Sequence, residues 1–234
     1  MHQVTDFRTR PEDSGEEALP LPTGSAIYES LTTKFVAFER LLVTLSEASH
    51  SGYVKLVAPG ANGIVLLREG KLIESLYRDH ADLRRGEVAI RSIQDAVEAG
   101  LGVLDIIALD AGIVDGLHGV ASGRTTYPEL YASWVNAEGL VRFLRDRQFT
   151  GSLIVSAGAG RGVIMLQGGN VSAAFTSTSR ELASDEGEVL ALCSDPEARL
   201  EVRELEQAGG HSANGTIVAG AVSALIEPET AEEF

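Results

Sequence analysis

A glycine-rich loop is the first stretch whose residue types could bind a ligand. Residues 158–162 read Gly-Ala-Gly-Arg-Gly, which is the glycine content of a phosphate-binding loop. Such a loop follows a strand and opens a helix, because the helix N-terminus is what meets the anion. Here the apolar run 163–166 follows instead. The spacing therefore favours a hairpin turn between two strands.

Three polar residues close together could form a small metal site. Asp79, His80 and Asp82 offer carboxylate and imidazole groups, which are common metal ligands. The sequence holds no second cluster of such ligands, and its five histidines lack a metal-binding spacing such as HExxH. We interpret the three residues as a solvated loop, and we expect neither a metal nor a cofactor.

The residues that nucleophilic enzymes use do not come together in the sequence. It contains no G-x-S-x-G motif, and Cys193 lies among apolar residues without a histidine nearby in the sequence. Asp105, Asp110 and Asp115 recur every five residues, a step that puts them on different faces of a helix. We therefore expect no catalytic residues and a protein that is not an enzyme.

Five arginines are the best candidates for binding a partner. They are Arg142, Arg145 and Arg147 on one predicted helix, and Arg84 and Arg85 at the start of another. A solvated helix face is the ordinary explanation for such residues. A cluster of cations also suits an acidic partner, or the acidic ends of this chain.

The composition narrows the class of protein. The chain has 234 residues and a formal net charge of −15, with a single cysteine. An acidic chain is poorly suited to nucleic-acid phosphates or anionic membranes. One cysteine allows no intrachain disulfide, and the N-terminal residues lack the apolar core of a signal peptide. We expect a cytoplasmic protein that binds neither nucleic acid nor membrane.

The elements that must position these residues occur twice. Residues 51–76 read as three short strands, and residues 150–175 repeat the pattern 99 positions later without a gap. The match extends outward, since Tyr28 corresponds to Tyr127 and Phe35 to Trp134. The sequence therefore predicts an internal duplication. Six matched glycines are expected to form the turns of the strands: Gly52, Gly63, Gly70, Gly151, Gly162 and Gly169.

Each copy is predicted to contain a helix, three strands, a second helix, a strand and a closing element. In the first copy the helices are 31–48, 84–99 and 111–122, and the strand is 103–109. In the second they are 129–147 and 181–193, with a strand at 200–203 and a closing helix or strand at 216–225. Phe35, Phe38, Leu42 and Leu45 recur at helical spacing and predict one apolar helix face.

These elements predict an α+β fold with two similar domains, each a small, mainly antiparallel sheet with flanking helices. We divide the chain into a disordered acidic lead (1–24), a first repeat (25–124), a second repeat (125–226) and an acidic tail (227–234). Duplicated domains tend to pack as homodimers do, so we expect a pseudo-dimer.

The repeated pattern of glycines and apolar residues is similar to the PatA-type N-terminal domain, a bacterial family found beside signalling modules. The first copy carries it in Ser51, Gly52, Gly63, Ile64, Leu66, Gly70, Leu72 and Gly86. The second carries it in Thr150, Gly151, Gly162, Val163, Met165, Gly169, Val171, Ala174 and Gly187. The resemblance implies a signalling or protein-interaction role without catalysis, with no functional residues to transfer.

The leading hypothesis is therefore a non-enzymatic adaptor or regulatory interaction module in bacterial cytoplasmic signalling. Its partner would be a protein, such as a response regulator, and a homo-oligomer is compatible with the pattern. One alternative is a roadblock-like partner of a small GTPase. Another is a small-ligand sensor or an enzyme with a pocket between the repeats.

Overall fold

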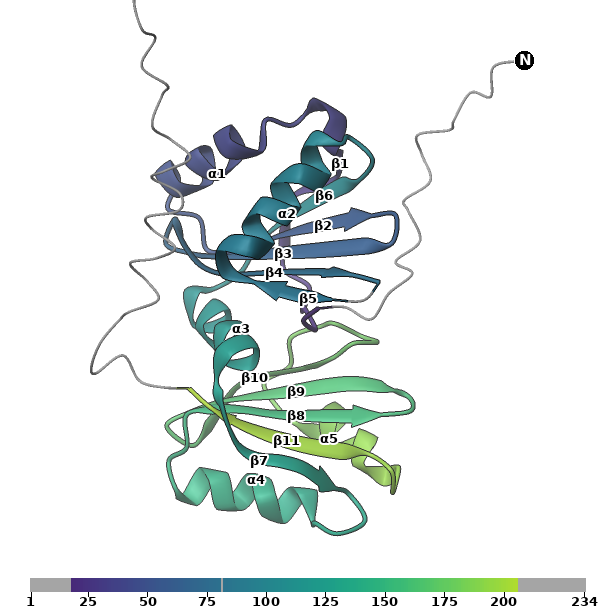
Figure 1. The fold of residues 1–234 in the computed structure, drawn as a ribbon. Coiled ribbons are helices and arrows are strands. Elements are labelled where there is room, and N and C mark those ends of the chain that lie inside the picture. The colour runs from purple at the N-terminus through teal and green to yellow at the C-terminus, as the bar shows by residue number, and fades with distance from the viewer. Residues whose placement is uncertain (1–17, 81, 206–234) are drawn as a thin grey trace, which may run out of the picture. The chain divides into compact units, whose positions relative to one another are not determined.

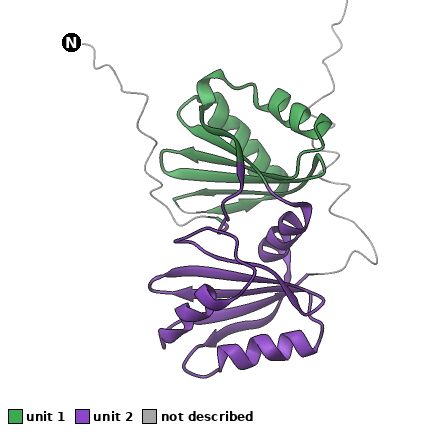
Figure 2. Cartoon of the chain, turned by 180° about the vertical axis from the view of Figure 1, so that it is seen from behind, with its two compact units in different colours: residues 1–18, 26–108, 210–234 green, residues 19–25, 109–209 purple. Residues whose placement is uncertain are grey.

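The structure is a computed structural model, and it describes residues 18–80 and 82–205. The chain forms two compact units (Figure 2). Among the described residues, the first unit comprises Ala18 and 26–108, and the second comprises 19–25 and 109–205. The boundary after Ala108 divides the chain into compact units. The predicted boundary at 124/125 divides it into sequence repeats, so the two boundaries describe different things. The repeat boundaries stay a prediction.

The first unit is a six-stranded antiparallel sheet with two helices on one face (Figure 1). Its strands lie in the order β1-β6-β2-β3-β4-β5. In chain order the elements are β1 (Ser25–Thr32), η1 (Thr33–Phe35), α1 (Phe38–Glu47), β2 (Gly52–Ala58), β3 (Ala61–Arg68), β4 (Lys71–Asp79), β5 (Leu83–Arg85), α2 (Gly86–Glu98) and β6 (Val103–Ala108).

The core of this unit forms where both helices meet the sheet. Phe38, Leu42 and Leu45 of α1 and Ile93 and Val97 of α2 are buried in one cluster with the strands. Both helices are therefore held by an apolar stripe at helical spacing.

The second unit is a five-stranded antiparallel sheet in the order β10-β9-β8-β11-β7. Its elements are α3 (Ala111–Ser122), β7 (Arg124–Tyr131), α4 (Ala137–Asp146), β8 (Gly151–Ala157), β9 (Gly160–Gln167), β10 (Asn170–Thr176), α5 (Gly187–Ala191), η2 (Leu192–Ser194) and β11 (Arg199–Glu204). α4 and α5 share a core with Ile164 and Leu166. α3 lies on the opposite face, beside Met165, because neighbouring residues of a strand point to opposite faces (Figure 1).

Five strands of the first unit have the same order and register as the five of the second, and β5 is additional in the first sheet. In the first, Gly52 pairs with Leu67 and Val57 with Asn62. In the second, Gly151 pairs with Leu166 and Ser156 with Arg161, each 99 positions later. The pairing of β3 with β4 shifts register between Leu72 and Glu74 of β4. The pairing of β9 with β10 shifts at the equivalent place, between Val171 and Ala173 of β10. The prediction of an α+β fold with antiparallel sheets is confirmed, and so are the three-strand segments.

Two edge strands occupy residues that the sequence analysis assigned to helices. Helices were expected at 31–48 and 129–147, but α1 and α4 begin only at Phe38 and Ala137, after β1 and β7. Most side chains of β1 and β7 are exposed, so these strands lack the alternation of buried and exposed residues that signals a strand. The expected helix at 181–193 is likewise reduced to α5 and η2. The third helix of the first copy is confirmed as α3.

Four of the six matched glycines lie in strands and are not turn residues, since Gly52 and Gly151 begin β2 and β8. Gly63 and Gly162 lie inside β3 and β9, and the hairpin turns precede these strands. A Cβ on Gly63 would lie 2.6 Å from Ile93 Cγ1, and one on Gly162 would lie 2.7 Å from Val189 Cγ1. Glycine is needed here because a helix packs directly on the strand. By contrast, Gly70 and Gly169 are turn residues with φ of 77° and 80°.

Several expectations fall outside the described residues. They include the closing element at 216–225, the acidic tail 227–234 and most of the acidic lead 1–24. Of the helices in 18–80 and 82–205, none has the length and apolar character needed to cross a membrane.

We predict that Gly63→Ala destabilises the protein by about 1–3 kcal/mol, because its Cβ would overlap Ile93 and overpack the core. Urea unfolding followed by circular dichroism measures the change. Gly112→Ala is the matched control, since a Cβ there meets nothing within 4 Å and the residue lies in α3. The control should be neutral or stabilising by up to about 1 kcal/mol. Equal destabilisation by both variants would refute the close-packing explanation.

Candidate interaction surfaces

The glycine-rich loop 158–162 is a two-residue hairpin, as its spacing predicted. Ala157 and Gly160 are paired at the ends of β8 and β9, which leaves Gly158 and Ala159 at the turn. The Gly158 N–H donates to Asp195 Oδ2 at 3.2 Å. A carboxylate beside the turn makes it a poor site for a phosphate, because like charges repel.

Asp79, His80 and Asp82 lie at the end of β4 and just after it, and the Asp79 side chain has other partners. Asp79 forms an ion pair of 2.8 Å with Arg84 and also accepts from the Asp82 N–H at 3.2 Å. His80 lies against the β2–β3 turn, where its Nε2 would be 2.1 Å from a Cβ on Gly60. Across 18–80 and 82–205, no group of three His, Cys, Asp or Glu side chains could hold a metal ion.

The arginines of α4 do not form one basic surface. Arg142 and Arg145 line an open hollow of about 400 Å³ together with Glu138, Asp185 and Glu186. Arg145 already forms an ion pair with Glu186 at 2.8 Å. The hollow therefore mixes two cations with three carboxylates, which weakens its attraction for an acidic partner.

The other three candidate arginines lie apart from this hollow. Arg147 stacks over the ring of Phe143 at 4.7 Å. Arg84 belongs to the first unit, where it bonds Asp79 and the Ser92 hydroxyl and lies 5.6 Å from the centre of the Tyr77 ring. Arg85 is the next residue of β5, so its side chain points to the opposite face. Partner binding by these arginines stays a prediction.

Both units expose aromatic side chains at matching positions. Phe35 is 81% exposed and Trp134 is 73% exposed, and each lies between an edge strand and the helix that follows it, β1 and α1 or β7 and α4. Tyr28 of β1 and Tyr127 of β7 are also exposed. The sequence placed Phe35 on a buried helix face, which is wrong because α1 begins three residues later.

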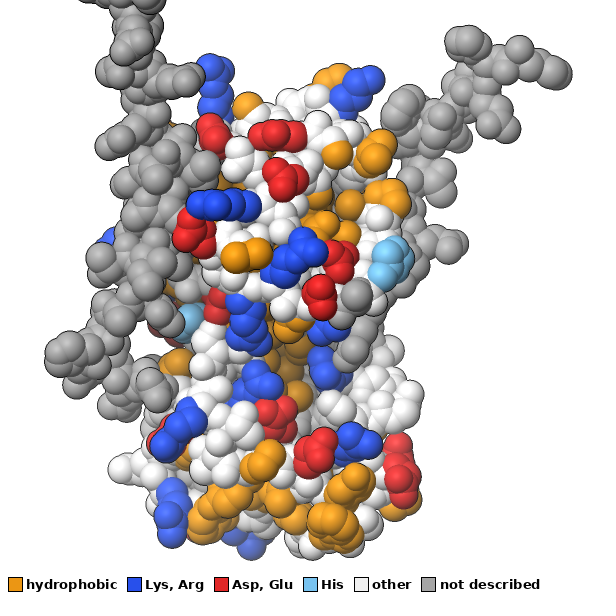
Figure 3. Space-filling view, in the orientation of Figure 1, with side chains coloured by type: hydrophobic (Ala, Val, Ile, Leu, Met, Phe, Trp, Pro, Cys, Tyr) orange, Lys and Arg blue, Asp and Glu red, His pale blue; other side chains and the backbone are white. Residues whose placement is uncertain are grey.

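The aromatic surface of the first unit is the more apolar of the two. We call it the first-unit surface, and it consists of the exposed side chains Ile27, Tyr28, Phe35 and Leu101, of which Ile27 and Tyr28 point to opposite faces of the sheet because they are neighbours in β1. Thr33 connects the segment that carries Phe35 to the segment that carries Leu101, because the Thr33 N–H and hydroxyl both donate to Gly102 O at 3.0 Å. Hydrophobic side chains gather over η1 and the connection from α2 to β6 (Figure 3).

The equivalent surface of the second unit carries more polar residues. We call it the second-unit surface, and it consists of Thr126, Tyr127, Trp134 and Glu197. The hydrogen bonds show which residues of the two units correspond. The Ala132 N–H donates to Ala198 O as the Thr33 N–H does to Gly102 O, so Glu197 corresponds to Leu101. The Trp134 ring lies 4.6 Å from the Tyr131 ring, and Arg199 lies 5.7 Å above Tyr131. Only the aromatic positions are thus shared by both surfaces.

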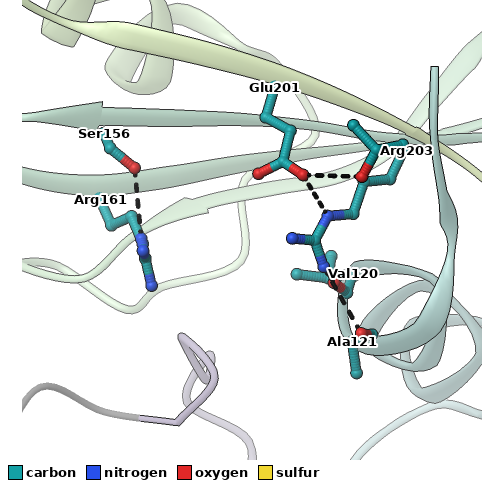
Figure 4. Close-up of polar contacts among 7 residues, drawn as sticks. Val120, Ala121, Ser156, Arg161, Glu201 and Arg203 are labelled. Carbon is teal, nitrogen blue, oxygen red and sulfur yellow. Dashed lines mark hydrogen bonds and ion pairs between the residues drawn. The ribbon is translucent and has the colours of Figure 1, made fainter. Parts of the chain in front are cut away.

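A polar network joins β11 to the end of α3 (Figure 4). Arg203 donates from Nη1 to the carbonyl oxygens of Val120 and Ala121, and from Nε to Glu201 at 2.8 Å. Thr125 also donates to Glu201, at 3.0 Å. The last carbonyls of a helix lack partners within it, so Arg203 satisfies the C-terminal end of α3.

Four side chains have shifted pKa values with identifiable causes, and one of them is Tyr77, whose pKa is raised chiefly by burial. Burial raises the pKa of Glu201, but the hydrogen bond and charge of Arg203 outweigh it, and the pKa is lowered overall. Burial also raises the pKa of the Cys193 thiol, which keeps it protonated, in keeping with a structural cysteine. Burial lowers the pKa of His50, against a smaller opposing effect of a backbone hydrogen bond with Ile107.

Comparison with known proteins gives one family match. Residues 19–118 match a family described as an uncharacterized protein conserved in archaea (DUF2226). The match covers residues 26–108 of the first unit together with 19–25 and the part of α3 up to His118, which is less than half of the chain. No curated protein and no solved structure gives a match.

This match corrects the family expectation. The resemblance to the bacterial PatA-type domain is wrong, because the matching family is a different one and is described as archaeal. The residues that carried the resemblance are glycines and apolar strand residues. They report hairpins and close helix packing, which unrelated sheets also need.

We predict that His50→Phe reduces the loss of stability on acidification. The pKa of His50 lies below its usual 6.5 in the folded protein, so the unfolded chain binds the proton more readily. The stability from neutral His50 is therefore complete above pH 6.5 and is lost as the pH falls through the folded pKa. Phe149 occupies the equivalent position, so phenylalanine suits the site. Urea midpoints at neutral and acidic pH test this, and parallel pH profiles for both proteins would contradict it.

We predict that Arg203→Met destabilises the protein by about 1–3 kcal/mol, because the part-buried carbonyl oxygens at the end of α3 lose a donor and Glu201 loses one of its two donors. Arg199→Met is the matched control on the same strand. Its ion pair with Glu129, at 3.4 Å, is exposed and should contribute less than about 1 kcal/mol. Thermal unfolding compares the two. A larger effect at Arg199 would show that the α3 contact contributes little.

Proposed function

We propose that this protein is a non-enzymatic adaptor or regulatory protein-interaction module that acts in the cytoplasm. The observation that carries the proposal is the pair of exposed aromatic side chains, Phe35 and Trp134, at the same position of both units. Aromatic residues dominate the energetics of protein interfaces, and exposing them in water has a free-energy cost. Their repetition supports a shared role in recognition.

We further propose that the two units arose by internal duplication. Equal strand order, register and bulge position support it, as do the matching bonds at the hairpins. His50 O accepts from Gly70 N–H at 2.8 Å, and Phe149 O accepts from Gly169 N–H at 2.8 Å. Two copies of one fold can present the same anchor twice, which raises the affinity for a partner with two matching elements. A pseudo-dimer arrangement of the copies would follow from the same origin.

The partner is a protein in this proposal, and its identity is the first thing to measure. The tagged protein is used to capture partners from the lysate of the cells that produce it. Phe35→Ser and Trp134→Ser are compared with wild type, and Val88→Ser, an exposed apolar residue of α2, is the control. We expect partner recovery to fall at least about tenfold in the aromatic variants, because losing a buried anchor costs about 2 kcal/mol or more.

Fluorescence supplies a direct second readout. Trp134 is the only tryptophan of the sequence, so the emission of the protein reports on the second-unit surface alone. Binding of the captured partner there should shift the emission to shorter wavelengths as the indole leaves water. If no partner responds to the aromatic variants, the proposal fails. A partner lost only with Arg142→Glu would place recognition on α4, and a GTPase among the partners would favour the alternative hypothesis.

A further inference from the structure

We propose that the first-unit surface binds a second copy of this chain, through antiparallel pairing of β1 with β1 about a two-fold axis. The inference rests on the proposed function, since it names one partner for one of the two aromatic surfaces. It starts from the position of β1 at the end of its sheet. β1 is hydrogen-bonded to β6 on one side, and none of the described strands pairs with its other side.

The straight part of β1 is suited to accept another strand. Residues 25–29 precede Ser30, whose positive φ of 54° bends the chain. The N–H of Ser30 donates inward to Asp105 Oδ1 at 2.8 Å, which holds the bend. Unpaired edge strands join other strands unless charges, proline or bulges prevent it. The bend leaves 25–29 as the segment available for pairing.

The equivalent strand of the second unit is better protected against pairing. β7 contains Pro128, which has no N–H to donate, and it begins with Arg124. Ile27 and Leu101 of the first unit correspond to Thr126 and Glu197 in the second, so the apolar character of the surface is lost there. Two copies of one fold thus differ at the edge that a partner strand would meet.

The exposed apolar side chains supply part of the area that a dimer needs. Ile27, Tyr28, Phe35 and Leu101 are 46, 56, 81 and 70% exposed. With roughly 200 Å² for each large side chain, they present on the order of 500 Å² of surface. Each partner of a standard interface buries about 800 Å². The strand backbone and flanking residues supply the remaining area.

A second copy fits this surface because a two-fold contact brings each patch against itself. An antiparallel pair centred on residues 25–29 places Ile27 opposite Ile27 of the second copy, and apolar cross-strand pairs stabilise sheets. Residues 25–35 carry only Glu29 and Lys34 as charges, so two copies of the segment meet without net repulsion. The whole chain carries −15, so long-range repulsion between copies remains.

This charge gives the contact a salt dependence that distinguishes it from an ionic one. Salt screens the repulsion between two acidic chains, so dimerisation should become tighter as ionic strength rises. A contact held by ion pairs with another protein would weaken under the same change.

Sedimentation velocity on the purified full-length chain tests the proposal, over concentrations from roughly 1 µM to 1 mM. We expect a monomer–dimer equilibrium in the wild type. Ile27→Lys and Leu101→Glu should each raise the dissociation constant at least about tenfold. The matched control is Thr126→Lys in the second unit, which should leave it unchanged. All three residues are exposed, and equal melting temperatures would verify that each variant folds.

The outcomes separate this inference from the proposed function. Trp134 emission should stay constant as the dimer forms, because the second-unit surface is not used. A monomer at every concentration, or a dimer insensitive to both substitutions, overturns the pairing of β1. A concentration-dependent shift of Trp134 emission also overturns it, since another surface would then associate. The partner-capture result does not depend on any of these findings.

Discussion

In each unit the chain comes so close to its neighbouring strand that only a glycine fits. A Cβ on Gly52 would lie 1.9 Å from Ile107 O, and one on Gly151 would lie 2.1 Å from Arg203 O. These glycines start the central strands β2 and β8, which pair with the last strand of each unit. The hydroxyls of Ser51 and Thr150, one residue earlier, accept from the turn between the next two strands. The close contact at the glycine and the adjacent hydroxyl bond together fix the positions of three strands in each unit. The helices pack on the surface that these strands form.

The sequence predicted this inner framework well because strong steric constraints leave a strong pattern. Glycines and apolar residues repeat with a constant offset, and the register follows the same offset. The edge strands left no comparable pattern, because exposed side chains are chosen for reasons other than packing. Phe35 shows the consequence. Its spacing to Phe38 suggested one helix face, yet only Phe38 is buried, and α1 begins at that residue.

The candidate site was less predictable than the fold, and the arginines show why. Charge in a sequence identifies cations but not the carboxylates that the fold brings to them. Arg145 meets Glu186, 41 residues away, and Arg203 meets the end of α3, more than 80 residues away. Long-range contacts of this kind satisfy a cation within its own unit. The aromatic pair was visible as a match in sequence, but its exposure depends on where the first helix begins.

The differences between the two aromatic surfaces follow from opposing physical demands. Inside each unit the same glycines and apolar residues recur, because the register and the helix contacts tolerate few substitutions. On the surface, Thr126 and Glu197 of the second unit stand at the positions that correspond to Ile27 and Leu101 of the first, while aromatic residues remain at both matched positions. An apolar edge favours association, and the net charge of −15 opposes it at long range. The more polar edge of the second unit shows that the fold itself does not require an apolar edge there.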